Sequence, residues 1–282
     1  MKTLLLTGAS GFLGSRIAAF YSKKYNIYAP THNEMDITDE ESVEAAFAKY
    51  KPDIVVHCAA VSDVGLCERE PEKSWKINVD GSIHIAKASN ELGAKCIICS
   101  SDQVYFGSSV KEAHREEEEL TPANLYGQEK LMAEKKCLEA NPDCVLLRLS
   151  WMYDTQTMRE GEHSDFLRTL LPKMKNGEAL CYPVYDRRGI TDVNEVVQNL
   201  EKTFTLTGGV YNFGSPNDKN TFETIYGVFK KAGLDTALLQ KNEEAFRGNP
   251  RNISMSQDKI NRCGISFSST ATGLLRNITG LV

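Results

Sequence analysis

A tyrosine and a lysine four residues apart, Tyr126 and Lys130, have the types and spacing that suggest acid–base chemistry. They fall in the helix-like stretch 123–140, so both side chains lie on one helix face. A phenol normally titrates near pH ~10, and a neighbouring ammonium would favour the phenolate and lower the pKa of the tyrosine. The pair therefore predicts a proton donor that works near neutral pH, as hydride transfer to a carbonyl requires.

A serine after a predicted strand could complete this chemistry. The apolar run Cys96–Cys99 is followed by two serines, an aspartate and a glutamine, so that Ser101 lies at the carboxyl end of the strand. Parallel sheets bind ligands at that edge, and a hydroxyl there could bond to a substrate carbonyl oxygen and polarise it. We therefore predict Ser101, Tyr126 and Lys130 as the catalytic residues.

Three glycines near the N-terminus are spaced for binding a dinucleotide. Gly8, Gly11 and Gly14 follow the apolar run 3–6 and open a helix-like stretch, in the pattern G-x-x-G-x-x-G. Glycines permit a tight turn, a close approach of the backbone to a pyrophosphate, and close packing of the helix on the strand. The helix N-terminus then offers N–H groups and the positive end of its dipole to phosphate.

The residues after the second predicted strand, 27–29, bear on which dinucleotide is bound. An acid there would bond to the ribose 2′-hydroxyl of NAD, but the sequence continues Pro30-Thr31-His32. Arg16 could meet the 2′-phosphate of NADP with its planar guanidinium, unless it is an ordinary exposed residue of the first turn. NADP(H) is therefore favoured over NAD(H). Asp36 could accept from the adenine amino group, or it could start the next helix.

The elements that must position these residues alternate along the first 150 residues. Short apolar runs separated by amphipathic stretches predict parallel strands covered on both faces, a doubly wound, Rossmann-like α/β sheet. Past residue 155, prolines and glycines break this rhythm. We predict a cofactor-binding domain over 1–160 and a smaller C-terminal α/β annex for substrate over 161–282, partly interleaved with it. The predicted strands are 3–6, 27–29, 54–57, 96–99 and 145–149, and the predicted helices are 12–24, 40–49, 72–92, 123–140, 193–204 and 222–232.

Composition narrows the range of partners. The 282 residues carry a net charge of −5, so no global basic field favours nucleic acid or a membrane surface. Mean hydropathy is −0.36, and no apolar run reaches the ~18 residues that a membrane span needs. Most of the eight cysteines lie in apolar runs, which is typical of buried, reduced thiols. We expect a cytoplasmic protein that binds small molecules.

Several stretches, taken in order, resemble the extended short-chain dehydrogenase/reductase superfamily. Within it they are most similar to the dTDP-4-dehydrorhamnose reductases, and the resemblance covers nearly the whole chain. The cofactor motifs are typical of the superfamily, whereas Ser-Trp-x-Tyr and the late Pro-Arg-Asn point to the reductase branch. The matching stretches are Thr7–Gly14, Asp36–Asp39, Cys58–Ala60, Glu70–Glu72, Asn78-Val79, Ser100–Asp102, Asn124–Lys130, Leu147–Tyr153 and Pro250–Asn252.

The resemblance implies NAD(P)H-dependent reduction of a nucleotide-activated 4-keto-6-deoxy sugar by a Ser/Tyr/Lys triad. Ser150 and Trp151 would lie beside the nicotinamide and the sugar, and Arg251 would contact the ligand unless it is a surface salt-bridge partner. The cofactor-binding residues would be Gly8, Ser10, Gly11, Phe12, Leu13, Gly14, Arg16, Asp36, Ile37, Ala59, Ala60, Asn78, Tyr126 and Lys130. The substrate-binding residues would be Asp102, Gln103, Ser150, Trp151, Arg188 and Arg251.

Departures from the family pattern fall where substrate would bind. Cys58 replaces an asparagine, Gln103 a tyrosine, and Arg187–Asp192 a Pro-Thr-Tyr stretch, which leaves the sugar nucleotide open. One alternative is a 4,6-dehydratase or an epimerase of the same superfamily. Dehydratases typically have an Asp-Glu pair after this strand, whereas here Asp102 is followed by Gln103. An amide cannot exchange a proton as a carboxylate does, which counts against dehydration. The other alternative is a non-catalytic regulatory subunit, resembling the β subunit of methionine adenosyltransferase.

Metal binding and oligomeric state are less readable. The histidines 57, 84, 114 and 163 are scattered, and no second pair accompanies the C-x-x-C of Cys96 and Cys99, so no metal motif is present. Mg²⁺ association is known in the rhamnose-reductase branch, through acidic residues that cannot be located in this sequence. Superfamily members often form homodimers through two long helices, which here would be 72–92 and 123–140.

Overall fold

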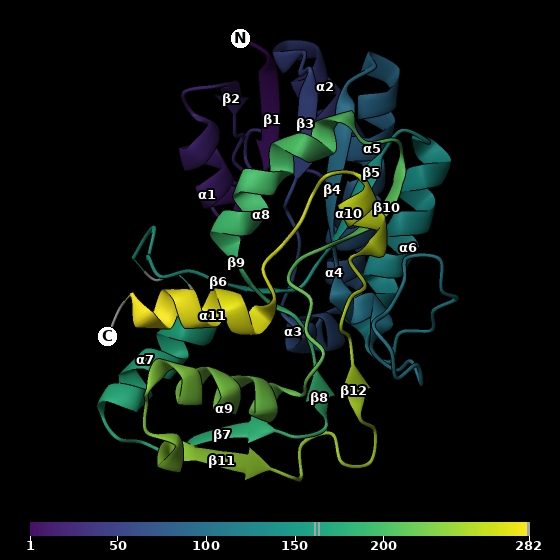
Figure 1. Cartoon of the computed structure of the whole chain (residues 1–282). Helices are drawn as coiled ribbons and strands as arrows, with labels where there is room; N and C mark the ends of the chain where they lie inside the picture. Colours follow the sequence, from purple (N-terminus) through teal and green to yellow (C-terminus); the bar gives the residue numbers. More distant parts are fainter. Residues whose placement is uncertain (161, 163, 281–282) are drawn as a thin grey trace.

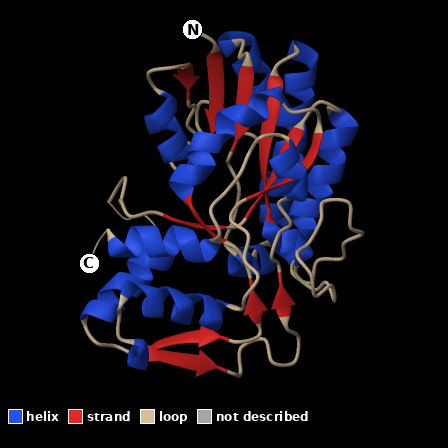
Figure 2. Ribbon diagram, viewed as in Figure 1, coloured by secondary structure: helices blue, strands red, loops and turns tan. Residues whose placement is uncertain are grey.

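A six-stranded parallel sheet forms the centre of the molecule in the computed structural model, which describes residues 1–160, 162 and 164–280 (Figures 1 and 2). Its strand order is β10-β5-β4-β3-β1-β2, with β2 on one side of β1 and β3 on the other, as a doubly wound sheet requires. All five strand pairings are parallel. The strands are β1 (Thr3–Thr7), β2 (Asn26–Tyr28), β3 (Ile54–His57), β4 (Lys95–Ser101), β5 (Val145–Leu149) and β10 (Gly209–Phe213).

Helices cover both faces of this sheet because its strands are apolar on both sides. Leu4 and Leu6 pack against one set of helices, whereas Leu5 points to the opposite face and packs against another. These leucines are fully buried. The first face is covered by α1 (Phe12–Tyr21) and α8 (Val193–Leu200), and the second by α2 (Glu40–Tyr50), α5 (Gly81–Leu92) and α6 (Leu125–Ala140).

The predicted helix 72–92 is wrong as one continuous α-helix. The chain forms α4 (Pro71–Trp75), a π-helical turn η1 (Lys76–Asp80) and then α5. A single π turn offsets the 3.6-residue period by only about one position, which is too small a change for the sequence pattern to predict. The predicted helix 193–204 likewise ends at Leu200 and continues as the 3₁₀ turn η3 (Glu201–Thr205).

A smaller lobe lies below the sheet in Figure 1 and has its own apolar core. Between the lobes, short parallel pairs join residues far apart in sequence: β6 with β9, and β8 with β12. The lobe contains α7 (Phe166–Lys175), β7 (Leu180–Pro183), α9 (Thr221–Ala232), η4 (Thr236–Leu238), β11 (Leu239–Asn242) and α11 (Thr270–Thr279). The connecting elements are β6 (Trp151–Tyr153), β8 (Asp186–Arg187), β9 (Ile190–Asp192) and β12 (Arg251–Asn252).

The chain after residue 160 contributes to both lobes. β10 pairs with β5 at the edge of the main sheet, and α8 packs on α1. A division into 1–160 and 161–282 therefore stays a prediction, and residues 161, 163, 281 and 282 lie outside the described residues. No helix in the described ranges is both long and apolar enough to cross a membrane. The other short elements are α3 (Val64–Arg69), η2 (Asp102–Tyr105) and α10 (Asp258–Arg262).

Candidate active site

The glycine-rich turn forms where β1 meets α1. Gly8 adopts a left-handed φ of +67°, and a Cβ there would lie 2.6 Å from the backbone nitrogen of Ala59. A Cβ on Gly14 would overlap the Gly8 carbonyl, so helix and turn pack backbone to backbone. Gly11 caps α1 and leaves its first turn without a side-chain cap. The open N–H groups of this helix end fit the diphosphate of a dinucleotide.

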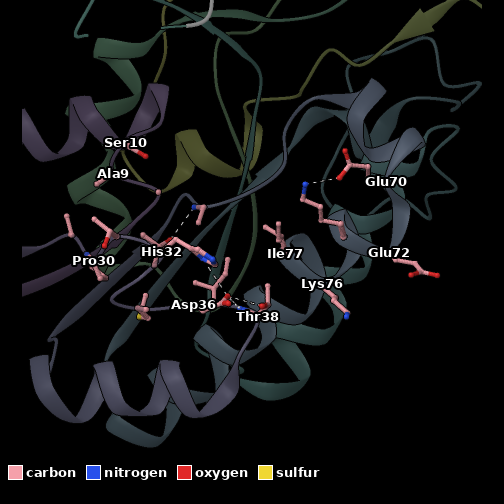
Figure 3. A pocket seen from close by; sticks show the side chains of 18 of the residues that line it. Ala9, Ser10, Pro30, His32, Asp36, Thr38, Glu70, Glu72, Lys76 and Ile77 are labelled. Carbon is pink, nitrogen blue, oxygen red and sulfur yellow. Dashed lines mark hydrogen bonds and ion pairs between the residues drawn. The ribbon is translucent and has the colours of Figure 1, made fainter. Parts of the chain in front are cut away.

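A cavity of 1230 Å³ extends from this turn past the ends of β1 and β2; we call it the β2-side cavity (Figure 3). Asp36 lines it, and its Oδ1 accepts from the backbone nitrogen of Thr38 at 2.9 Å and from Thr38 Oγ1 at 2.8 Å. The backbone hydrogen bond from Thr38 lowers the pKa of Asp36. An ionised acceptor on this wall suits an adenine amino group. The predicted Gly8, Ser10, Ile37 and Ala59 also line this cavity.

Arg16 lines neither this cavity nor the one described next, contrary to the sequence prediction. It is 5% exposed, and its Nε donates to Asp154 while Nη1 and Nη2 bond to Glu162. The guanidinium also lies 3.9 Å from the centre of the Phe12 ring. The charge of Arg16 is therefore balanced by acidic residues that follow β6, and the first of these, Asp154, is 138 residues away in sequence. The expectation of an Arg16 contact with a 2′-phosphate does not fit this arrangement.

A second cavity, of 630 Å³, opens at the carboxyl ends of β3, β4 and β5; we call it the Tyr126 cavity. Gly8 lines both cavities, so that they meet at the glycine-rich turn. All three predicted catalytic residues line it. The other predicted residues on its walls are Gly11, Phe12, Leu13, Gly14, Ala60, Asp102, Gln103, Ser150, Trp151, Arg188 and Arg251.

Tyr126 and Lys130 are held by the first turns of α6. Asn124 caps the helix, its Oδ1 accepting from the Gly127 nitrogen at 2.7 Å. Lys130 Nζ donates to the Cys99 carbonyl at 3.0 Å and lies 5.9 Å from the centre of the Tyr126 ring. This geometry places the ammonium on the cavity floor beside the phenol.

Electrostatics at this pair differ from the sequence prediction. Burial raises the pKa of Tyr126, and a hydrogen bond with Ser101 opposes that shift only in part. Burial also lowers the pKa of Lys130. The expected depression of the phenol pKa by the ammonium is therefore wrong, because desolvation dominates. The result is a phenol that stays protonated, which is the form a proton donor needs.

Asp102 and Arg188 form a long ion pair on the wall of the Tyr126 cavity. Asp102 Oδ2 lies 3.7 Å from Arg188 Nη2, and burial raises the pKa of Asp102 to about 6 against the opposing charges of Arg188 and Arg251. Among the described residues, neither Asp102 Oδ2 nor Arg188 Nε has a hydrogen-bond partner. Arg188 lies 4.9 Å from the Trp151 ring centre. Buried polar atoms without partners suit a polar ligand.

The remaining predicted residues are held by local partners. Arg251 is no surface salt-bridge partner: its side chain is 16% exposed, and its Nε donates to Asp186 at 2.7 Å. Gln103 Oε1 accepts from Asn124 at 3.0 Å. Ser150 Oγ bonds to Thr191 Oγ1 at 2.5 Å.

Asn78, predicted as a cofactor residue, lines neither cavity but supports the wall between them. Its Oδ1 accepts from the Val61 nitrogen at 2.8 Å, and its Nδ2 donates to the Val61 carbonyl at 3.0 Å. It also donates to Glu129 Oε2 at 2.6 Å. Glu129, fully buried within α6, was missed by sequence reasoning. A glutamate next to a lysine is common in exposed helices, so the sequence alone does not predict that Glu129 is buried.

Comparison with known proteins places this arrangement in a family. Residues 1–274 match the family described as RmlD substrate binding domain. The chain belongs to that family. It is 30% identical to the spore coat polysaccharide biosynthesis protein SpsK of Bacillus subtilis, over 94% of this chain and 93% of that protein. It is 34% identical to a dTDP-4-dehydrorhamnose reductase of Mycolicibacterium smegmatis, over 83% of this chain and 70% of the other.

Solved structures agree on the fold. A dTDP-4-dehydrorhamnose reductase of Bacillus anthracis in complex with NADP superposes with a TM-score of 0.85, at 24% identity and 99% coverage of each chain. The corresponding enzyme of Yersinia enterocolitica gives a TM-score of 0.84, at 22% identity and full coverage of both chains. The predicted Rossmann-like fold is thereby confirmed. Within the described ranges, no three His, Cys, Asp or Glu side chains group to hold a metal ion.

Proposed function

We propose that this protein is an NADP(H)-dependent reductase of a nucleotide-activated 4-keto-6-deoxy sugar, of the dTDP-4-dehydrorhamnose type. The observation that carries the proposal is the meeting of Ser101, Tyr126 and Lys130 in one cavity that joins the glycine-rich turn. The names of the relatives support the substrate class. A dinucleotide spanning both cavities would place its nicotinamide near Tyr126, with the sugar towards Asp102 and Arg188.

When bound, a reduced nicotinamide would supply the hydride that the sugar's carbonyl carbon accepts. Tyr126 donates its phenolic proton to the carbonyl oxygen, and Ser101 holds that oxygen through its hydroxyl. Lys130, fixed by the Cys99 carbonyl, would stabilise the phenolate that remains and could hold the cofactor ribose. The products are the alcohol and the oxidised cofactor, after which Tyr126 recovers a proton from solvent.

Substrate recognition falls to the charged and aromatic groups of the Tyr126 cavity. Arg188 and Arg251 are cations that can bind the nucleotide diphosphate, and Asp102 Oδ2 can accept from a sugar hydroxyl. Trp151, which is 40% exposed, offers a ring face beside them. Gln103 and the positions of Arg187–Asp192 are the departures that would set the sugar's identity.

We infer NADP(H) over NAD(H) from the β2-side cavity. No acid immediately follows β2, and the wall there consists of Ala29, Pro30, Thr31 and His32. With Arg16 engaged elsewhere, Lys73, which pairs with Glu70, and Lys76 are the cationic candidates on this cavity for a 2′-phosphate, and His32 lines the cavity as well (Figure 3). A homodimer through α5 and α6, and association with Mg²⁺, stay predictions that light scattering and chelation can test.

The direct test follows absorbance of reduced nicotinamide when the purified protein meets NADPH and dTDP-4-keto-6-deoxy sugar. Loss of absorbance, with a deoxysugar nucleotide as product, is expected. An inert mixture in which NADPH still binds would instead favour the regulatory-subunit alternative, and tightly retained NAD would favour an epimerase. The dehydratase alternative lacks its second acid, because Gln103 is an amide bonded to Asn124.

A further inference from the structure

Two cysteines face each other on the floor of the Tyr126 cavity. β3 pairs with β4 up to His57 and Ile98, so Cys58 lies next to Cys99 one residue further along. Their Sγ atoms are 3.5 Å apart, and both are free thiols. Neighbouring strands lie ~4.8 Å apart, within the Cα separation of ~4.4–6.8 Å that a disulfide spans. Because both side chains pack on the same face of the sheet, side-chain rotation can bring the sulfurs to bonding distance.

The surroundings of this pair make the two thiols unequal. The hydrogen bond between the sulfurs lowers the pKa of Cys99, and the nearby Lys130 ammonium acts in the same direction. The same hydrogen bond, together with burial, raises the pKa of Cys58. The hydrogen bond from Cys58 and the Lys130 ammonium both favour the thiolate form of Cys99, which makes Cys99 the better nucleophile of the two and Cys58 the thiol that follows.

A second cysteine pair in the same sheet provides an internal comparison. Cys96 and Cys144 are also register neighbours, one residue before the pairing of Ile97 with Val145. They are 1% and 0% exposed, and they lie in the apolar core on the opposite face. Neither lines a described cavity, whereas Cys58 and Cys99 both line the Tyr126 cavity. In both pairs the cysteines occupy neighbouring positions on paired strands, but only Cys58 and Cys99 line a described cavity.

We propose that Cys58 and Cys99 are a modification site that forms a reversible disulfide when the cleft is empty, and that this bond opposes cofactor binding. The oxidant is a hydroperoxide. The Cys99 thiolate attacks one peroxide oxygen, the O–O bond breaks, and the leaving oxygen departs as an alcohol or as water. The Cys58 thiol then displaces water from the resulting sulfenic acid and forms the S–S bond. Two thiols are oxidised, one peroxide is reduced, and a dithiol reverses the change.

The bond opposes cofactor binding because Cys58 begins the segment that lines both cavities. Ala59 lies on the β2-side cavity and Ala60 on the Tyr126 cavity, and the Ala59 backbone packs against Gly8. A disulfide would tie this segment to the end of β4, so that the chain after β3 could no longer adjust where the two cavities meet and a dinucleotide would pass. A bound dinucleotide would conversely cover both thiols, and this part of the proposal rests on the proposed function.

The experiment treats the full-length protein with hydrogen peroxide and maps its thiols by alkylation and peptide mass spectrometry. We expect a cross-link between the Cys58 and Cys99 peptides, reversal by dithiothreitol, and protection by NADPH. Cys96 and Cys144 should not react in the folded protein, and after unfolding they should both still be alkylated as free thiols. NADPH affinity of the oxidised protein, measured by fluorescence titration, should fall by about tenfold, which corresponds to about 1.4 kcal/mol.

Variants separate this site from the other thiols. Cys58→Ser and Cys99→Ser should lose the cross-link and the peroxide sensitivity of NADPH binding, whereas Cys181→Ser, which removes an exposed thiol away from the cleft, should keep both. The proposal is overturned if Cys58 and Cys99 stay separately alkylatable under peroxide, or if they cross-link without weakening NADPH binding. If NADPH binds neither form, the proposed function fails, and the cross-link alone still tests the modification site.

Discussion

The two cavities that meet at Gly8 are built on different principles. The β2-side cavity, 1230 Å³ in volume, is lined by small side chains, by the hydrogen-bonded carboxylate of Asp36 and by exposed charged residues such as Glu70 and Lys76. The Tyr126 cavity is about half that size and is lined by buried ionisable groups, among them Tyr126, Lys130, Asp102 and Arg188. The charged groups of the first cavity are mostly exposed to solvent, whereas the second cavity holds its charged groups largely away from water.

The two cavities also differ in how strongly they change the pKa values of the groups that line them. Burial changes the pKa values of Tyr126, Lys130 and Asp102, because each loses water and gains only part of a compensating partner. In the β2-side cavity, a hydrogen bond from a neighbouring backbone group favours the ordinary ionised form of Asp36. Perturbed pKa values cluster at functional sites, so the contrast supports the proposal that the reaction takes place in the Tyr126 cavity and that the β2-side cavity binds part of the cofactor.

The largest expected effect is a loss of catalysis, without a loss of cofactor binding, when the proton donor of the Tyr126 cavity is removed. Tyr126→Phe should lower kcat by about 10³-fold, within the range that general acids contribute, while NADPH affinity changes little. The exposed Tyr185 offers the matched control, because Tyr185→Phe removes the same hydroxyl outside both cavities. Steady-state NADPH oxidation and fluorescence titration measure the two quantities. Retention of more than about a tenth of kcat in Tyr126→Phe would contradict the assignment.

The next effect concerns the stability of the glycine-rich turn, where the two cavities meet. Gly14→Ala should destabilise the fold by about 2 kcal/mol and weaken NADPH binding, because its Cβ meets backbone rather than a movable side chain. Gly227, within α9, has open space where a methyl group would lie, so Gly227→Ala should instead stabilise by about 0.5–1 kcal/mol. Urea unfolding compares the two. Equal stability of Gly14→Ala and wild type would remove the packing argument.

A smaller effect is specific to charge in the Tyr126 cavity. Asp102, with a pKa of about 6, loses its charge as the pH falls through that value, and its proton then occupies a site meant to accept from a sugar hydroxyl. We expect kcat/KM to fall about tenfold per pH unit below that midpoint. Asp102→Asn should be slower at neutral pH but lack this acidic limb. An unchanged limb in the variant would assign it to another group.

The smallest effect tests whether Arg16 belongs to either cavity. Because Asp154 and Glu162 already bind its guanidinium, Arg16→Ala should lower thermal stability while changing the ratio of NADPH to NADH affinity by less than about twofold, well under 1 kcal/mol. Titration of both dinucleotides with wild type and variant measures this ratio. A selective loss of NADPH affinity would restore the sequence-based role for Arg16, and equal affinities in wild type would refute the NADP preference.

Local patterns carried much of the fold. The strands 54–57 and 145–149 were predicted with the bounds that the structure has, because uninterrupted apolar runs between polar turns suit a doubly covered sheet. Asp39 caps α2, and Gly93 ends α5 in the left-handed region, both as their residue types indicate. The sixth strand, β10, was missed, because its pairing with β5 joins segments more than 60 residues apart.

Residue types and spacing were enough to predict the glycine-rich turn, the shared helix face of Tyr126 and Lys130, and the strand end that carries Ser101. These depend on spacing within a few residues. Only the tertiary structure decided that Arg16 is bound by the segment after β6, that burial rather than Lys130 governs the Tyr126 pKa, and that Cys58 meets Cys99. The reason is physical: charge partners, desolvation and strand neighbours are contributed by residues distant in sequence, and exist only once the chain has packed.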